Sequence, residues 1–456
     1  MNLPDALLNS LKGIEGFDYE AFTAVHQRAQ PPVSVRLNPR KPLHTLPFPG
    51  VTRVPWSAYG YYLEERPSFT LDPRLHAGAY YVQEASSMFL EQALRQHAGL
   101  DKSLRVLDLC AAPGGKSTLL QAVLSDDSLL VSNDVLKSRT AILEENLTKW
   151  GVLNTVVTNN DPRDFSALPA FFDVMVVDAP CSGSGLFRRD PQLTAEWSPQ
   201  TVQLCSQRQQ RILSDAYPAL AAEGLLIYST CSYSREENES ITEWLLTNFE
   251  LEPLRIETDP AWNIIETSTT SGGFGYRFFP DKIAGEGFYL SCFRKKDGDK
   301  GTAGKNKKRS SAVVKPVPAQ TLHPFAASVP EIVFIPFGDR ILAVHETVQQ
   351  ILPRLQETLY LRKAGAAAGK LSPKGLIPDH ELALSGLIGN EVVDIALNLE
   401  DALQYLRKEA VSLNEAKAGW ATVSYDGLRL GWVKVLSGRM NNYYPQAWRI
   451  LKSSVN

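Results

Sequence analysis

The sequence predicts an α/β protein built on a doubly wound, mostly parallel sheet of seven strands. Between residues 101 and 295, short apolar runs alternate with amphipathic helical stretches, which is the pattern of strands joined by crossover helices. The first run, SLRVLDL, leads into the helical stretch GKSTLLQAVL, and the second, LLVSND, leads into KSRTAILEENLTKW. Gly151 directly after that second stretch is a typical helix C-terminal residue.

The other strands follow in order along the chain. They are predicted over NTVVTNND, FFDVMVVDAP, GLLIYST, LEPLRIE and EGFYLSCFR, and the last two are expected to form an antiparallel hairpin at one edge. Two more helices are predicted over QTVQLCSQRQQRILSDAYPALA and SREENESITEWLLTNF. Ser234 opens the last helix with Glu237 three residues later, which has the form of a capping box.

Composition divides the chain into further modules. Residues 1–95 predict a small N-terminal α+β domain, with a strand in PPVSVRLNPRK, ahead of the larger block of residues 96–295. Residues 296–324 are rich in Lys, Gly and Ser and predict a basic, solvated linker. We expect a separate module after it, divided into a small intermediate domain (325–388) and a β-barrel (389–456) with a hairpin turn at Asp426-Gly427.

Composition also limits the class of protein. With 456 residues, 44% of them hydrophobic, the chain can bury a large core, and no apolar run approaches the roughly 18 residues of a membrane span. The start MNLPDALLNS lacks the basic and apolar segments of a secretion signal, so a cytoplasmic location is expected. Five scattered cysteines and seven scattered histidines predict neither disulfides nor a metal site. The net charge of -3 means that any nucleic acid must be held by local basic patches. We also expect the protein to be a monomer.

A glycine-rich loop follows the first predicted strand. The segment Asp108 to Thr118, DLCAAPGGKST, ends in Gly-Lys-Ser, but Cys110 stands where a nucleotide phosphate loop needs its first glycine. Small residues here let a ligand approach the backbone at a helix N-terminus. We interpret the loop as a nucleoside cradle.

Acids end the next two strands. Asp134 is placed to accept hydrogen bonds from ribose hydroxyls, and Asp161 is placed to meet an adenine amino group. Each acid alone is more typical of a helix cap or turn. Together they face one crevice at the carboxyl edge of the sheet, where such folds bind ligands. The strict Gly-x-Gly-x-x-Gly of hydride-transfer enzymes is missing, which favours an adenosine-bearing methyl donor.

Two cysteines follow the fourth and fifth strands. Cys181 comes after Asp178 in VVDAPCSGSG, and Cys231 lies in IYSTCSYS. Neighbouring parallel strands would bring both thiols to the same edge, beside the cofactor crevice. Turns rich in Ser and Gly before helix N-termini favour reactive thiolates over buried apolar cysteines, whereas Cys205 and Cys292 are expected to be ordinary core residues.

A methyl donor, an acid and two thiols suit methylation of cytosine at C5. A thiolate that adds to C6 makes C5 nucleophilic, and a second thiol near C5 could assist the later loss of its proton. Asp178 could hydrogen-bond the base around N3. Spacing alone does not say which of Cys181 and Cys231 attacks.

Five motifs together resemble the Nop/Sun class of RNA 5-methylcytosine methyltransferases: LDLCAAPGGKST, SND, NND, VVDAPCSGSGLFRRDP and YSTCSYSREENE. The resemblance implies the Rossmann-like class I fold that binds S-adenosyl-L-methionine (AdoMet). It implies that Cys231 is the nucleophile and that Cys181 serves product release. It also implies an AdoMet site formed by Cys110, Ala111, Ala112, Pro113, Gly114, Gly115, Lys116, Asp134, Asp161 and Asp178. Asp134 departs from the class, in which Glu is common. The segments Arg36-Leu-Asn38 and Tyr81 to Ser87 resemble it too, so residues 1–95 are expected to be an accessory, RNA-binding domain ahead of the catalytic AdoMet-dependent domain of residues 96–295.

The C-terminal stretch GWVKVLSGRMNNYYPQAW resembles the tail of bacterial RsmF-type enzymes. This implies a PUA-like RNA-binding unit and methylation in the decoding region of 16S ribosomal RNA, with that RNA or the small ribosomal subunit as partner. Its Trp and Tyr residues are expected in a barrel core, and its basic residues could follow a phosphate backbone; these are Arg429, Lys434, Arg439 and Arg449. Methylation of transfer RNA and a non-catalytic role in ribosome assembly are the alternatives. DNA is disfavoured as the substrate, because DNA cytosine methyltransferases attack with the cysteine of the Pro-Cys motif, which is Cys181 here.

Overall fold

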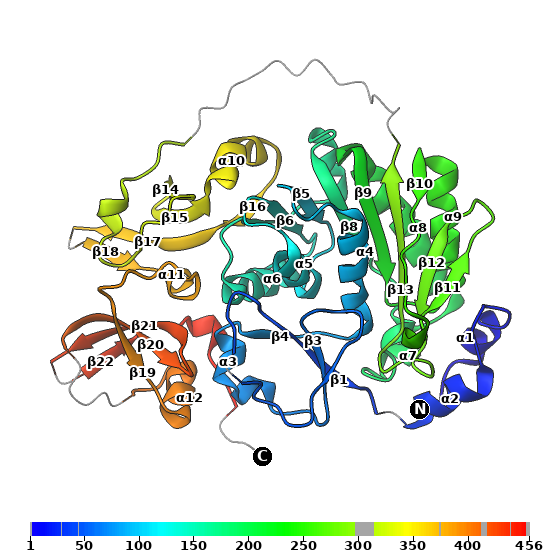
Figure 1. The fold of residues 1–456 in the computed structure, drawn as a ribbon, viewed down its shortest axis with the longest axis horizontal. Coiled ribbons are helices and arrows are strands. Elements are labelled where there is room, and N and C mark those ends of the chain that lie inside the picture. The colour runs from blue at the N-terminus through cyan, green and yellow to red at the C-terminus, as the bar shows by residue number, and fades with distance from the viewer. Residues whose placement is uncertain are drawn as a thin grey trace.

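A computed structural model describes residues 2–28, 30–43, 45–296, 314–373, 375–411, 417–437 and 439–452. Most of the predicted linker, residues 297–313, lies outside these ranges. The elements form a large central sheet flanked by helices, with an N-terminal module below it and two C-terminal units at one side (Figure 1).

The central sheet confirms the predicted fold class. Five strands run parallel at its centre in the order β9-β8-β5-β6-β7. Their bounds are β5 (Arg105–Asp108), β6 (Leu129–Asn133), β7 (Thr155–Thr158), β8 (Phe172–Asp178) and β9 (Leu220–Thr230). The sheet order departs from chain order between β5 and β8, so the crevice of a doubly wound fold opens there.

The sheet has ten strands, three more than the seven predicted. The antiparallel strands are β10 (Leu251–Pro253), β11 (Ile265–Ser268), β12 (Phe274–Phe278), β13 (Phe288–Lys295) and β16 (Leu361–Ala364). The last two predicted strands, β10 and β13, do pair antiparallel. They are not a hairpin, because β11 and β12 intervene in the chain and β12 also pairs with β13.

Both faces of the sheet are covered by helices, as its alternating side chains require. Val106 and Ile227 point into a core shared with α4 (Leu90–His97) and α5 (Gly115–Val123). Leu107 and Leu226 point to the opposite face. That face is covered by α8 (Pro199–Ala216), α9 (Glu239–Asn248) and α10 (Glu346–Thr358). α6 (Lys137–Trp150) ends as predicted at Gly151, whose φ of 87° is left-handed.

The N-terminal module is α+β, as predicted. Its antiparallel sheet has the order β2-β3-β1-β4. The bounds are β1 (Val33–Leu37), β2 (Thr52–Arg53), β3 (Gly60–Leu63), β4 (Tyr80–Val82) and α3 (Pro73–His76). Two further helices, α1 (Asp5–Ser10) and α2 (Tyr19–Arg28), lie apart from this sheet and pack on Phe187, Tyr233 and Phe279 of the catalytic block (Figure 1).

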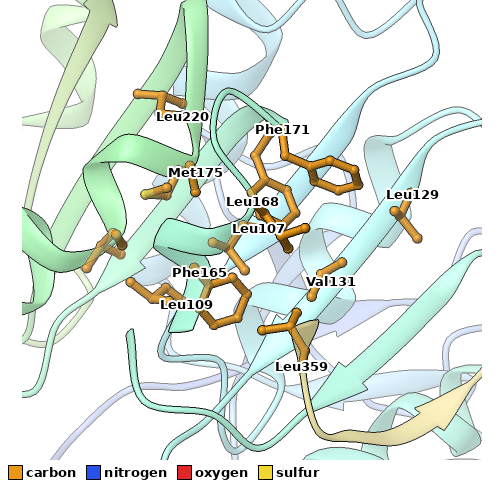
Figure 2. Packing of buried hydrophobic residues seen from close by; sticks show 14 of the residues in the cluster. Leu107, Leu109, Leu129, Val131, Phe165, Leu168, Phe171, Met175, Leu220 and Leu359 are labelled. Carbon is orange, nitrogen blue, oxygen red and sulfur yellow. The ribbon is translucent and has the colours of Figure 1, made fainter. Parts of the chain in front are cut away.

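The segment after residue 314 has a small core of its own, which includes Phe334, Leu376 and Leu382, and it also packs on the catalytic block. Its own sheet has the order β14-β15-β17-β18, and α11 (His380–Leu384) packs on it. The bounds are β14 (Ile332–Phe337), β15 (Arg340–His345), β17 (Ala366–Ser372) and β18 (Gly375–Pro378). β16, directly before β17, joins the central sheet by pairing with β7. Leu359, just after α10, belongs to the cluster of Leu109 and Val131 in the catalytic core (Figure 2).

The C-terminal unit is a four-stranded sheet with one helix, α12 (Leu399–Arg407). Its strands are β19 (Val393–Ala396), β20 (Gly419–Tyr425), β21 (Leu428–Leu436) and β22 (Arg439–Asn442), and the β20–β21 turn falls at Asp426-Gly427 as predicted. Trp432 and Tyr444 are buried in it, whereas Tyr443 is exposed. Among the described residues, no helix is long and apolar enough to cross a membrane.

Gly365, at the junction of β16 and β17, provides a test of this architecture. Its φ is 53°, and a Cβ there would lie 2.2 Å from the carbonyl oxygen of Ala343. Gly365→Ala should therefore lower the free energy of unfolding by about 2 to 4 kcal/mol, from backbone strain plus the clash. Gly338→Ala is the matched control, because its φ is 60° but its Cβ would meet nothing within 4 Å. Equal losses in denaturant unfolding would contradict the close approach of this junction to the β15 backbone.

Candidate active site

Two cysteines meet at the carboxyl edge of the central sheet. β8 and β9 are parallel neighbours, and Asp178 lies opposite Ser229 in their register. The two chains therefore leave the sheet side by side, and the Sγ atoms of Cys181 and Cys231 are 3.1 Å apart. Both thiols are free and half-buried. The structure thus brings together the two cysteines that the sequence analysis singled out.

The two thiols are in different environments. The hydrogen bond to Cys231, burial and the nearby charge of Glu237 all raise the pKa of Cys181 well above its ordinary value. This direction favours the protonated thiol at Cys181, and in the contact between the two sulfurs either thiol can be the donor. The separation of 3.1 Å is well beyond the roughly 2.05 Å of a disulfide.

A cavity of about 840 Å³ runs from the glycine-rich loop to the thiols. That volume lies within the range of about 300 to 1,000 Å³ common for small-molecule sites. Its lining includes three predicted AdoMet-site residues, namely Cys110, Asp134 and Asp178, and both thiols. It also includes apolar side chains from three elements: Val135, Leu136, Pro162 and Leu204.

The rest of the predicted AdoMet loop does not line this cavity in the described structure. The loop is held against the end of β6, since the Ala111 N–H donates to the Asn133 carbonyl at 2.7 Å. Gly114 has a φ of 114°, which favours glycine, and α5 begins after it. A Cβ on Gly115 would lie 3.3 Å from the Tyr81 ring. Ala112, Pro113 and Gly115 therefore lie behind the cavity surface, where they contact Asp134, Asn146 and Tyr81.

The three predicted acids have different partners. Asp134 is nearly buried and accepts hydrogen bonds from the N–H groups of Ala112, at 3.3 Å, and Leu136, at 2.9 Å. Asp161 caps the short helix that follows it and pairs with Arg211 at 3.6 Å. It does not line the cavity in the described structure, although the adjacent Pro162 does.

Asp178 sits in a cluster of charges. Its carboxylate accepts from the Ser229 hydroxyl at 2.8 Å and pairs with Lys116 Nζ at 2.7 Å. Burial lowers the pKa of Lys116, but Asp178 outweighs it, so the net pKa is raised. Burial also raises the pKa of Asp108 to about 7, and the neighbouring Asp178 adds to this, although the Ser117 hydroxyl bonded at 2.6 Å opposes it.

Sequence reasoning misassigned Glu237. The Ser234 side chain makes no capping hydrogen bond, so the predicted capping box is wrong. The Glu237 side chain instead turns inward and is fully buried, where it accepts hydrogen bonds from Ser182 and Ser232. A Cys-Ser pair recurs in both thiol loops, and this repeat was the available signal.

The structure adds three arginines that the sequence analysis did not name. Arg139 on α6 and Arg208 and Arg211 on α8 line the same cavity. Leu204, one turn before Arg208, is 62% exposed. One side of the cavity therefore carries positive charge together with an exposed apolar side chain.

The front segments are structural joints between the N-terminal module and the loop. Arg36 is fully buried and donates to Gln83 at 2.7 Å and to Thr118 of α5 at 2.6 Å. Asn38 donates to the carbonyls of Gly78 and Trp150. These contacts go beyond ordinary strand or capping chemistry, because they fix β1 to two helices of the catalytic block.

Comparisons with known proteins agree with this geometry. The sequence family described as 16S rRNA methyltransferase RsmB/F matches residues 98–294, which hold the whole cavity. Residues 3–85 match the N-terminal domain of 16S rRNA methyltransferase RsmF, and residues 392–450 match the RsmF PUA domain. Ribosomal RNA small subunit methyltransferase F of Enterobacter sp. is 30% identical over 429 residues, covering 87% of this chain and 84% of that protein.

The chain belongs to the 16S rRNA methyltransferase RsmB/F family. The protein of the same name from Cronobacter sakazakii is 29% identical over 426 residues, again covering 87% of this chain and 84% of that protein. The crystal structure of NSun6 from Pyrococcus horikoshii shares the fold, with a TM-score of 0.52 and 19% identity, covering 64% of this chain and 98% of that chain. This RsmB/F-family chain is thus a methyltransferase whose C-terminal unit is a PUA domain.

Asp108 gives this RsmB/F-family site a measurable pH signature. Its folded pKa of about 7 lies above the value near 4 of an unfolded chain, so the folded state holds one extra proton between those values. The contribution of Asp108 to the free energy of unfolding therefore falls as pH rises from about 4 to 7. The Asp108→Asn variant should lack this pH dependence. As pH rises from about 4 to 7, the free energy of unfolding of the variant minus that of the wild type should therefore increase by up to about 1.4 kcal/mol per pH unit.

Thermal unfolding of both proteins at several pH values, without ligand, measures this difference. The Asp173→Asn variant is the control, because Asp173 is a partly exposed acid at the opposite end of β8. A pH-independent difference for Asp108→Asn would show that Asp108 is ionised throughout the range.

Proposed function

We propose that this protein methylates C5 of cytosine in ribosomal RNA, with AdoMet as methyl donor, through a covalent bond between Cys231 and C6 of the base. The observation that carries the proposal is the pair of free thiols 3.1 Å apart at one end of the cavity that begins at the glycine-rich loop. A single thiol would be enough to activate the base, and the second gives the site a group for release.

The chain's residues suit each step of this reaction. Cys231, as a thiolate, adds to C6, and the electron pair displaced from the C5–C6 double bond makes C5 nucleophilic. Asp178 holds the base near N3, and Lys116 keeps this carboxylate oriented. After C5 has gained the methyl group, its proton must leave so that the Cys231–C6 bond can break. Cys181, in contact with Cys231, is the group placed to assist that release: its thiol gives its proton to the departing Cys231 sulfur, and the thiolate so formed takes up the C5 proton.

The cavity also fits AdoMet, which would supply a methyl group on a positively charged sulfur. Asp134 and Asp178 provide carboxylates for its hydroxyl and amino groups, and Val135, Pro162 and Leu204 provide apolar surface for its adenine. Ala111, Ala112, Pro113, Gly114, Gly115 and Lys116 would hold the site from behind, through Cys110. Asp161 is a weaker candidate, because its carboxylate caps a helix and pairs with Arg211.

Small-subunit ribosomal RNA is the proposed substrate, most specifically the decoding region of 16S RNA. The relatives with the longest matches are named ribosomal RNA small subunit methyltransferase F, and both accessory families are named for RsmF. Arg139, Arg208 and Arg211 beside the cavity could hold phosphates of a strand whose cytosine has left the stack. The C-terminal basic residues Arg429, Lys434, Arg439 and Arg449 are proposed to follow the same backbone. We propose a cytoplasmic, monomeric enzyme.

Two variants test the covalent mechanism. Cys231→Ala should abolish methyl transfer to small ribosomal subunits or their RNA, because C5 is then not activated. Cys181→Ala should retain attack but not release, so it should accumulate an enzyme–RNA adduct that survives a denaturing gel. Cys292→Ala is the control, because that thiol is buried in the core away from the cavity. An adduct formed by Cys231→Ala would reverse the two roles.

Bisulfite mapping of ribosomal and transfer RNA tests the substrate. Cells that lack the protein should lose 5-methylcytosine at one or more positions of 16S RNA and keep it in transfer RNA. Loss confined to transfer RNA would identify the enzyme as a tRNA methyltransferase instead. Unchanged methylation in both would favour the assembly-factor alternative.

A further inference from the structure

Glu237 connects the loops that carry the two thiols. Its Oε1 accepts hydrogen bonds from the backbone N–H of Ser182, at 2.8 Å, and from Gln209 Nε2, at 3.3 Å. Its Oε2 accepts from the hydroxyls of Ser182, at 2.6 Å, and Ser232. Ser182 directly follows Cys181, and Ser232 directly follows Cys231. One buried carboxylate therefore fixes both cysteine loops.

The Glu237 charge has no cation beside it in the described part of the chain. All four of its partners are neutral donors, which is the set that an ionised carboxylate accepts. Burial raises the pKa of Glu237, and these hydrogen bonds oppose that effect. Burying a carboxylate without a cation is costly even when its oxygens accept hydrogen bonds. The presence of a negative charge at Glu237 therefore requires a physical reason.

The carboxylate is attached more firmly to the Cys181 loop. Two of its four hydrogen bonds come from Ser182, and only one comes from Ser232. The Glu237 charge is one of the causes that raise the pKa of Cys181, after the Cys231 contact and burial. A negative charge beside Cys181 disfavours a second one on its sulfur. The proton consequently stays on Cys181, which can donate it to Cys231 Sγ.

We propose that Glu237 is a positioning residue that gives the two thiols unequal roles, because its carboxylate holds the Cys181 loop by two hydrogen bonds and the Cys231 loop by one, and so leaves Cys231 as the thiol free to attack. The inference deepens the proposed function and rests on it for the reaction. The arrangement answers the question that spacing left open, namely which cysteine is the nucleophile. Glu237 does not line the cavity in the described structure.

Thiol reactivity in the resting, full-length protein tests this inference without RNA. The protein is treated with iodoacetamide at neutral pH, and the alkylation rates of the Cys181 and Cys231 peptides are followed by mass spectrometry. In the wild type, Cys231 should react faster. In Glu237→Gln, the Cys181 rate should rise about tenfold or more, because the thiolate fraction grows tenfold for each unit by which the pKa falls. The ratio of the two rates should fall accordingly.

Glu236→Gln is the matched control, because it removes the same charge from an exposed neighbour of Glu237. It should leave both rates unchanged. AdoMet affinity and the melting temperature, measured on each variant, report whether the fold is intact. Unchanged rates in a folded Glu237→Gln protein, or equal acceleration of both thiols, would overturn the proposal.

Glu237→Asp keeps the inference testable if the glutamine variant does not fold. The aspartate retains the charge on a shorter side chain, so Cys231 should remain the faster thiol. Equal rates in this variant would also overturn the role of the charge. Failure of the proposed function would give a different result. In that case no RNA adduct would form through Cys231, although the alkylation ratios would behave as expected.

Discussion

The pairing of β8 with β9 is the constraint on which the candidate active site depends. Because Asp178 lies opposite Ser229, both chains leave the sheet at the same level, and further hydrogen bonds continue beyond the strands. The Ala179 N–H donates to the Ser229 carbonyl, and the Gly185 N–H donates to the Cys231 carbonyl. A shift of register by one residue would turn Asp178 to the other face of the sheet. The thiol contact is therefore a consequence of strand register.

The charges around the cavity suit two different requirements of the proposed reaction, namely binding of the methyl donor and binding of the RNA backbone. Asp108, Asp134 and Asp178 gather at the carboxyl edge of the sheet with Lys116 among them, and this acidic environment favours a positively charged methyl donor. The same acids would repel RNA phosphates. Arg208 and Arg211, on the α8 side of the cavity, supply the opposite charge. The proposed reaction therefore places the donor and the RNA backbone on different faces of one cavity.

The sequence predicted those parts of the fold that depend on residues close together in the chain. Gly151 ends α6, and Cys181 and Cys231 follow neighbouring parallel strands, because apolar runs and glycine act over a few residues. β16 was missed because its partner β7 lies about two hundred residues earlier in the chain. Glu237 was misread for a related reason. Its spacing from Ser234 fits a capping box, but its actual partners, Ser182 and Gln209, belong to other loops and helices.

The N-terminal module supports the candidate active site, because it is bonded to the helix that begins at the glycine-rich loop. Arg36 is fully buried, and no carboxylate pairs with it in the described residues, which is a costly arrangement for a cation. That cost is offset by hydrogen bonds to Gln83 and Thr118 and by the face of Trp150, 4.7 Å away. Because Thr118 belongs to the helix that begins at the glycine-rich loop, displacement of β1 would leave a buried charge without partners. The loop and the N-terminal module must therefore keep one fixed arrangement for the cavity to exist.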